Sequence, residues 1–239
     1  MDNAGYAALT RQVGLMREMQ VVANNMANMA TTGYRREGVV FTEFVRALEG
    51  GESISMATSG AGFSSEIQGA LTRTGRSLDL AIEGEGYFLI ATPEGDMQTR
   101  AGSFVLSEDG GLVTADGMAL LDAGGAPVFV PPATAAISVA SDGTLSADGL
   151  PVAQIGLWQT AAPGGAERRA GTRFALEGAP VPAVEGSGRI VQGFLESSNV
   201  SPVAEIARMI EVQRAYELGQ SFLEREDARA RAVIQSFAR

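Results

Sequence analysis

The sequence predicts an α+β fold. Long N- and C-terminal helices pair as a coiled-coil-like inner domain and flank a central, antiparallel all-β domain. Apolar residues recur at three- and four-residue steps at both ends, which indicates amphipathic helices. Of the 30 glycines, only Gly5, Gly14 and Gly219 lie in residues 1–32 and 200–239. The middle carries turn signals about every 8–12 residues, as antiparallel β domains do.

These patterns divide the chain into four expected parts. Residues 1–34 form the N-terminal helix of the inner domain, and residues 35–75 an extended arm or linker. Residues 76–192 form the β-rich outer domain. Residues 193–239 form a return linker and the C-terminal helix of the inner domain.

The N-terminal helix is expected over residues 3–34, ending near Thr31–Thr32 with Gly33 as its left-handed cap. Two neighbouring apolar ladders run along it, and together they are too wide to leave in water on a lone helix. The first ladder is Leu9, Val13, Met16, Ala23, Ala27 and Ala30. The second is Leu15, Met19, Val22, Met26 and Met29.

Three of the chain's five asparagines, Asn24, Asn25 and Asn28, stand within five residues near the end of this helix. One interpretation is a frayed helix end that is satisfied by water and backbone. The other is that the side-chain amides bridge to a neighbour's backbone, both donating and accepting. The residues alone leave both open.

The arm is expected to begin with extended structure or a hairpin after Tyr34. The small, polar residues of 50–62 predict a flexible crossing loop. In the body, Asp-Gly pairs at 109, 116, 142 and 148 predict tight turns. Gly84-x-Gly86 is interpreted as a strand-joining turn rather than a nucleotide loop, because no third glycine, long helix or lysine follows.

The C-terminal helix is expected from Ser201, an N-cap followed by Pro202 in the first turn, almost to Arg239. Its ladder keeps three- and four-residue steps, and its polar rungs would fix the register of packing. The ladder is Ile206, Met209, Gln213, Tyr216, Gln220, Leu223, Asp227, Ala230, Ile234 and Phe237.

Composition excludes much chemistry. The chain has no cysteine, histidine or lysine, and all 18 basic residues are arginine. Thiolate, imidazole and Schiff-base chemistry are therefore absent, and we expect no catalytic site, cofactor or metal. The net charge of −10 argues against nucleic acid. The sequence has no run of 18 apolar residues, so we expect no transmembrane segment, and the first residues do not predict a cleaved signal peptide.

Two of the three acids Asp79, Glu83 and Glu85 could form a carboxylate pair for glycoside hydrolysis. They alternate with apolar residues, so solvent-facing strand positions explain them better. A secreted β-domain glycan hydrolase acting through Asp79 and Glu85 stays as an alternative, as does a monomeric adhesin or binding module.

Residues 23–36, ANNMANMATTGYRR, resemble the N-terminal motif of the flagellar rod, hook and hook-associated proteins. Asn24, Asn25, Ala27, Asn28, Thr31 and Gly33 fit that motif. Residues 78–90, 99–121 and 195–218 resemble three further blocks of the family, in the same order. Within it, the length and single modest insert are most similar to those of proximal rod subunits, with distal rod subunits next.

The resemblance implies a non-enzymatic subunit of the bacterial basal-body rod that assembles through its terminal helices and transmits torque. It also implies type III export without signal cleavage and a place in the rod across the periplasm. The partners would be further copies, neighbouring proximal and distal rod proteins and the export apparatus. The expected assembly interface is Leu9, Val13, Met16, Met19, Ala23, Asn24, Asn25, Ala27, Asn28, Thr31, Gly33, Tyr34, Asn199, Ile206, Met209, Ile210, Gln213, Tyr216 and Leu223.

Overall fold

The computed structural model describes residues 2–46, 54–132, 134–159, 168–176, 178–184 and 186–237. The chain forms two compact units. The helical unit comprises Met1–Ala27, Glu37–Phe63 and Ser201–Arg239. The β unit comprises Asn28–Arg36 and Ser64–Val200. An N-terminal and a C-terminal helix and a central antiparallel β region are thus confirmed.

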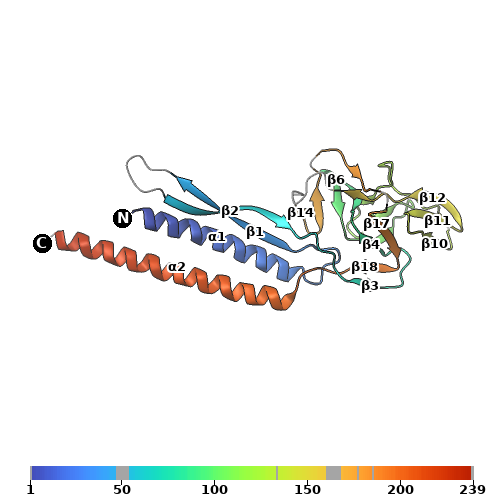
Figure 1. The fold of residues 1–239 in the computed structure, drawn as a ribbon. Helices are drawn as coiled ribbons and strands as arrows, with labels where there is room; N and C mark the ends of the chain where they lie inside the picture. The colour runs from blue at the N-terminus through green and yellow to red at the C-terminus, as the bar shows by residue number, and fades with distance from the viewer. Residues whose placement is uncertain are drawn as a thin grey trace. The chain divides into compact units, whose positions relative to one another are not determined.

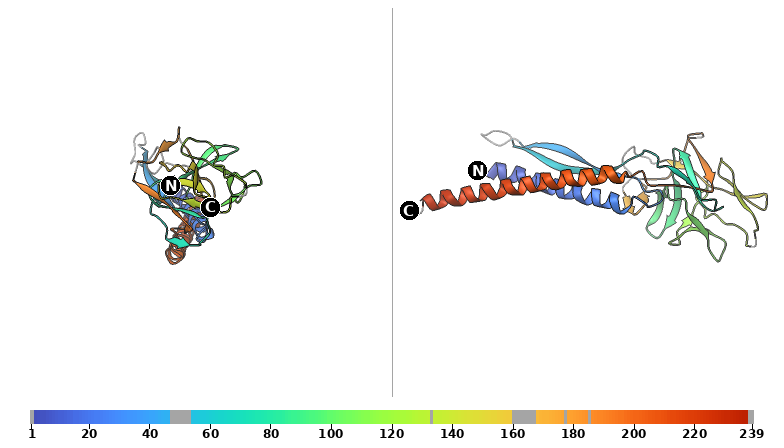
Figure 2. Two further views of the ribbon diagram at one scale, coloured as in Figure 1. Left: turned by 90° about the vertical axis from the view of Figure 1, so that its right-hand side faces the viewer. Right: turned by 90° about the horizontal axis from the view of Figure 1, so that it is seen from below.

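The helical unit contains α1 (Asp2–Ala27), β1 (Glu37–Arg46), β2 (Ile54–Ser64) and α2 (Pro202–Phe237). The two helices lie side by side in the views of Figures 1 and 2. They run antiparallel, because Gln12 contacts Tyr216 and Glu18 contacts Arg208. Pairing of the two helices is therefore observed, whereas coiled-coil geometry stays a prediction.

The core of the helical unit is small and half polar. Among its described residues, the buried apolar side chains are Leu15, Val22 and Val212. Four polar side chains, Gln12, Glu18, Asn25 and Glu205, are buried beside them. Hydrogen bonds between side chains therefore contribute to holding α1 against α2, in addition to apolar contact.

The expected end of the first helix at Thr31–Thr32 is wrong, because α1 ends at Ala27. The next residues form a turn in which the Asn28 carbonyl accepts a bond from the Thr31 N–H at 3.1 Å. The Asn28 side chain accepts a second bond from the Thr31 hydroxyl, also at 3.1 Å. This local side-chain bonding competes with helix continuation. Gly33 has the predicted left-handed backbone, with φ of 70°, but it lies beyond the helix.

The flexible loop expected over residues 50–62 is also wrong where the structure describes it, because β2 covers 54–64. This strand pairs with β1 in a two-stranded sheet. Gly38 faces Phe63, and a Cβ there would overlap the aromatic ring. Backbone pairing with β1 makes this stretch of small residues a strand, and such pairing cannot be predicted from composition. Residues 50–53 lie outside the described residues.

The β unit consists of short strands. In chain order they are β3 (Leu71–Arg73), β4 (Leu80–Gly84), β5 (Phe88–Thr92), β6 (Gly95–Thr99), β7 (Phe104–Leu106), β8 (Leu112–Thr114), β9 (Ala119–Leu120), β10 (Ile137–Val139), β11 (Thr144–Ala147), β12 (Leu150–Gln154), β13 (Trp158–Gln159), β14 (Arg168–Ala170), β15 (Arg173–Ala175), β16 (Val181–Pro182), β17 (Gly188–Gln192) and β18 (Phe194–Glu196).

Its largest sheet has the order β14-β15-β6-β5-β9-β8-β7. Smaller sheets are β10-β11-β12, β17-β4, β18-β3 and β13-β16. The strand pairs of the β unit are antiparallel, as expected. The return strand β17 pairs with β4, and β18 pairs with β3. The end of the β unit is therefore tied to its beginning.

The core of the β unit is a cluster of fourteen buried hydrophobic residues. Phe88 and Phe104 meet edge to face in it, with ring centroids 5.5 Å apart. The predicted Asp-Gly turns are confirmed, since Gly110, Gly117, Gly143 and Gly149 have φ of 82–91°. The Gly84-x-Gly86 segment is likewise a turn, between β4 and β5.

Candidate assembly interface

The two apolar ladders of α1 separate in the structure. On the ladder containing Leu15 and Val22, these two side chains are buried, Met19 and Met26 are half-buried, and Met29, beyond the end of α1, is 49% exposed. The ladder containing Leu9, Val13 and Met16 is exposed, and these side chains keep 51%, 67% and 50% of their surface open. Ala23 and Ala27 on the same ladder are exposed as well. We call Leu9, Val13, Met16, Ala23 and Ala27 the α1 stripe.

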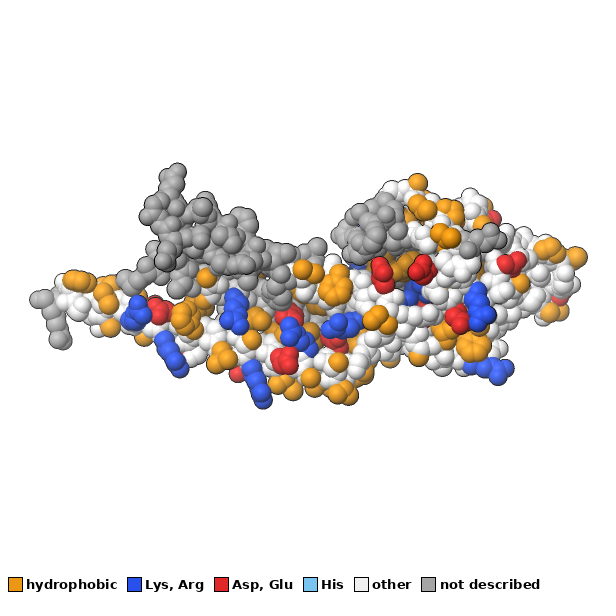
Figure 3. Space-filling model, viewed as in Figure 1, with side chains coloured by type: hydrophobic (Ala, Val, Ile, Leu, Met, Phe, Trp, Pro, Cys, Tyr) orange, Lys and Arg blue, Asp and Glu red, His pale blue; other side chains and the backbone are white. Residues whose placement is uncertain are grey.

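The expected positions on α2 divide in a similar way. Met209, Tyr216 and Leu223 are half-buried, whereas Ile206, Ile210 and Gln213 are exposed. Met19 on α1 is also half-buried. Figure 3 shows hydrophobic side chains along the lower edge of the helical unit, among arginine and acidic side chains. The chain thus leaves apolar surface on both helices that it does not itself cover.

Arg208 ties α1 to α2 through an ion pair with Glu18, with an N–O distance of 2.5 Å. The hydrogen bond that Arg208 donates to Glu18 is the main reason that the pKa of Arg208 is raised, and its hydrogen bond to Glu211 adds to the effect. The Arg208 side chain is 46% exposed, so water screens this pair and its contribution to stability is modest.

Asn25 is fully buried, and its side chain binds the backbone of Glu37, the first residue of β1. Its Nδ2 donates to the Glu37 carbonyl at 2.9 Å, and its Oδ1 accepts from the Glu37 N–H at 2.9 Å. The same Nδ2 lies 3.3 Å from Oε2 of the buried Glu205 at the start of α2. One amide therefore connects α1, β1 and α2.

Asn199 makes an analogous contact inside the β unit. Its Oδ1 accepts from the Arg36 N–H at 2.6 Å, and its Nδ2 donates to the Ile67 carbonyl at 2.7 Å. The expected pattern of an amide that both donates and accepts is therefore present. For Asn25 and Asn199, the backbone groups that they bind belong to the same chain. Asn24 is exposed, with its Nδ2 3.4 Å from the Glu37 carboxylate.

Gly33 and Tyr34 lie inside the β unit. The Gly33 N–H donates to the Glu196 carbonyl at 2.7 Å. The Tyr34 ring is 1% exposed, and the Arg168 guanidinium lies 4.3 Å from its centroid. A Cβ at Gly33 would overlap the backbone of Arg100 and Ala101. Thr31 is half-buried nearby in the chain.

A buried ion cluster beside these residues was not predicted. Glu196 binds Arg35 through Oε1 at 2.9 Å and Arg100 through Oε2 at 3.2 Å. All three side chains are at most 5% exposed. Burial and then the charge of Arg35 lower the pKa of Arg100, against the opposing effect of Glu196. Glu196 lies in the motif block of residues 195–218 and Arg100 in that of residues 99–121, and only the fold brings the two side chains together.

The three carboxylates of the hydrolase alternative differ in exposure, because Glu83 and Glu85 are exposed, as expected, whereas Asp79 is buried. Asp79 is 1% exposed, so its expected solvent-facing position is wrong. It bridges to Ser103, whose hydroxyl donates to it at 3.4 Å. Glu83 instead pairs with Arg189 at 2.7 Å. Within the described ranges, no cluster of three or more acidic residues could hold a metal.

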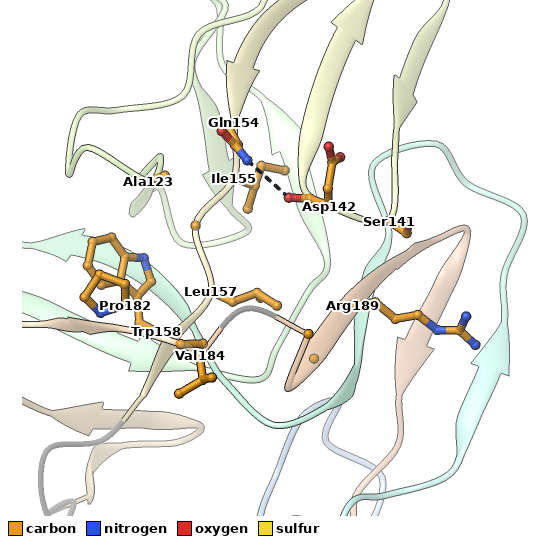
Figure 4. Close-up of a pocket in the computed structure, with 14 residues that line it drawn as sticks. Ala123, Ser141, Asp142, Gln154, Ile155, Leu157, Trp158, Pro182, Val184 and Arg189 are labelled. Atoms are coloured by element: carbon orange, nitrogen blue, oxygen red, sulfur yellow. Dashed lines mark hydrogen bonds between the residues drawn. The ribbon is translucent and has the colours of Figure 1, made fainter.

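A hollow of about 480 Å³ in the β unit is lined by side chains that are largely committed elsewhere (Figure 4). Gln154 donates to the Asp142 carbonyl at 3.4 Å across it. Asp142 itself accepts from the Thr144 N–H at 2.9 Å, and Arg189 is paired with Glu83.

The β unit has its own core, and both terminal helices carry exposed apolar side chains. Exposed apolar surface of this kind is typical of proteins that pack against partners. Comparison with known proteins identifies the family. Residues 81–147 match the family described as flagellar hook protein FlgE/F/G D1 domain. Residues 191–236 match the flagellar basal body rod FlgEFG protein C-terminal family.

Similar proteins cover nearly the whole chain. A flagellar basal-body rod protein FlgF of Mesorhizobium japonicum is 38% identical, over 91% of this chain and 90% of that protein. The FlgF of Caulobacter vibrioides is 36% identical over 98% of both. A rod protein FlgG of Bacillus subtilis is 32% identical over 93% of this chain and 94% of its own.

The chain therefore belongs to the flagellar basal-body rod protein family and is most like FlgF. This family is structural and not an enzyme family, and its members belong to the basal body of the bacterial flagellum. Within the described residues, no helix is long and apolar enough to cross a membrane.

Proposed function

We propose that this chain is a subunit of the proximal part of the rod, where it assembles through its terminal helices and transmits torque from motor to hook. The higher identity to FlgF proteins than to the FlgG protein supports the proximal position. The partners would be further copies, the neighbouring proximal and distal rod proteins and the export apparatus. Export would proceed without a cleaved signal, into a rod that spans the periplasm.

The observation that carries this proposal is the exposed α1 stripe. Leu9, Val13 and Met16 expose half or more of their surface, whereas Leu15 and Val22 on the adjacent ladder are buried by the chain itself. Fully burying such side chains stabilises by about 1.5–3 kcal/mol each. Neighbouring subunits that cover the stripe, in coiled-coil-like packing, would recover this free energy only in the assembled rod.

The domain roles follow from the same idea. The terminal helices would form the inner part of the rod, and the β unit the outer part. The expected interface residues that the chain buries, such as Asn25 and Tyr34, would support assembly by holding the subunit's own structure. The exposed ones, such as Val13 and Ile206, would contact neighbours directly.

Deleting the gene tests the rod role, because it should abolish motility and leave incomplete basal bodies. The double variant Val13→Asp/Met16→Asp tests the stripe: aspartate on a face that becomes buried is costly, so rods should fail to assemble. Leu150→Asp, at a residue that is 70% exposed in the β unit, is the matched control and should leave motility normal. Normal motility of the double variant would refute the role of the stripe.

The asparagines are tested separately. The Asn25→Ala/Asn28→Ala variant should impair rod assembly while the β unit stays folded, and unimpaired motility would argue against their role. The alternative position, in the distal rod, is tested by immunogold labelling of isolated basal bodies. Label at the hook side of the rod would replace the proximal assignment with the distal one.

A further inference from the structure

The helical unit contains a groove between its two helices, with a volume of about 580 Å³. Leu218 and Phe222 stand at its edge and are 72% and 43% exposed. Small residues on both helices, Ala8, Ala215 and Gly219, also line it. Arg11 and Gln12 add polar atoms to an otherwise apolar lining. A groove of this kind, with small residues in its lining, can accept a helix that lays its apolar face into it.

Gln12 lines the same groove and leaves one polar atom unsatisfied. Its side chain is 8% exposed, and its Nε2 donates to the Tyr216 carbonyl at 2.9 Å. Its Oε1 is buried and has no hydrogen-bond partner among the described residues. A buried acceptor without a partner is costly, so the groove would gain from an occupant that brings a donor. Gly219 fits here because a Cβ would overlap the Gln12 amide.

The other end of α2 carries the complementary feature. Gln12 meets Tyr216 and Glu18 meets Arg208, so Asp2 at the start of α1 falls beside about residue 226. Residues 227–237 therefore extend past α1, as Figures 1 and 2 show at the end carrying both termini. At 1.5 Å per residue, these eleven residues are about 16 Å long. We call residues 227–237 the α2 extension.

One face of the α2 extension is apolar. Ala230, Val233 and Phe237 follow at three- and four-residue steps, and Val233 and Phe237 are 37% and 86% exposed. This spacing gives the row of anchors that a helix presents to a groove. Ala228 and Ala232 lie on the opposite face of the same turns.

The α2 extension cannot reach the groove of its own chain, because both lie on one continuous helix. Val233 is fourteen residues from Gly219, about 21 Å along the axis. We propose that the α2 extension of one copy docks in the α1–α2 groove of a second copy. Groove and extension are different surfaces, so the contact is head-to-tail and leaves each end open for another copy. This inference rests on the proposed function and specifies one of its contacts.

Disulfide cross-linking tests the contact, since the chain has no cysteine of its own. The variant Leu218→Cys/Val233→Cys is produced in cells that also carry the wild-type gene, so that rods assemble. After mild oxidation, isolated basal bodies should contain this chain as a ladder of disulfide-linked dimers, trimers and longer products. A second pair, Ala8→Cys/Val233→Cys, probes the α1 side of the groove.

The matched control is Leu218→Cys/Ala232→Cys, which places the second thiol on the opposite face of the α2 extension and should give no ladder. The proposal is overturned if the variant chains enter basal bodies but neither Val233 pair cross-links. It is also overturned if the control cross-links equally or the product joins this chain to a different protein. These outcomes leave the rod assignment intact, whereas normal motility after gene deletion would overturn the rod assignment itself.

Discussion

Replacing Asn25 with alanine should destabilise the helical unit selectively. Asn25 is fully buried. It forms hydrogen bonds to the Glu37 N–H and carbonyl, both at 2.9 Å, and to the Glu205 carboxylate at 3.3 Å. Each bond contributes about 1 kcal/mol net, so their loss should cost about 3 kcal/mol. Without the Asn25 amide, the Glu37 backbone groups and the Glu205 carboxylate would lose this partner, and only water that reached them could replace it.

Two spectroscopic signals separate the two units. Both described helices belong to the helical unit, so far-UV circular dichroism follows that unit. The single tryptophan, Trp158, lies in the β unit, so its fluorescence follows the other. In urea unfolding of the full chain, Asn25→Ala should move the dichroism midpoint to lower urea and leave the fluorescence midpoint in place.

Asn24→Ala is the matched control, because Asn24 is the adjacent asparagine and is exposed. Its substitution should change the dichroism transition by less than about 0.5 kcal/mol, as is usual for surface positions. Equal effects of the two substitutions would refute the assignment of Asn25 as the amide that joins α1, β1 and α2. An equal shift of the fluorescence transition would refute the independence of the two units.

Four further predictions concern the β unit. Glu196→Gln should destabilise it by about 3–5 kcal/mol in the fluorescence assay, because two buried arginines lose their counter-charge. Glu83→Gln, in an exposed ion pair, should cost less than about 1 kcal/mol. Gly33→Ala should cost more than the roughly 1–3 kcal/mol of left-handed strain, because its Cβ would also overlap backbone. Hydrogen bonds donated by Thr144 lower the pKa of the Asp142 carboxyl below its ordinary 3.8. The stability that this turn gains is therefore present above pH 3.8 and is lost as the pH falls through the lowered pKa. An NMR titration would follow this change.

Most of the secondary structure could be predicted from the sequence, but the ends of some elements could not. Ser201 and Pro202 predicted the start of α2 correctly, since capping is a local property. The Asp-Gly turns were correct for the same reason. The end of α1 and the strand β2 were missed. The end of α1 comes from the turn in which Asn28 bonds to Thr31, which the spacing of apolar residues does not indicate. The strand β2 is a strand only through its pairing with β1.

The candidate site was predictable as a set of residues but not as a set of roles. The spacing of the apolar residues placed Leu9 and Leu15 on two adjacent ladders and predicted burial equally for both. Only the position of α2 decides that Leu15 is buried and Leu9 is exposed. The cluster of Arg35, Arg100 and Glu196 could not be predicted by spacing, because its members are 65 and 96 residues apart along the chain.

The difference between the two cores explains why the expected interface residues should fall into two classes in mutagenesis. Among the described residues, the β unit has fourteen in its apolar cluster and needs no neighbour to bury them. Those of the helical unit bury three apolar side chains and four polar ones, and leave the α1 stripe exposed. Substitutions at Asn25 therefore act first on the folding of the chain and only then on assembly. Substitutions at Val13 or Met16 should leave the isolated chain unchanged, because the contacts that they remove would form only between subunits.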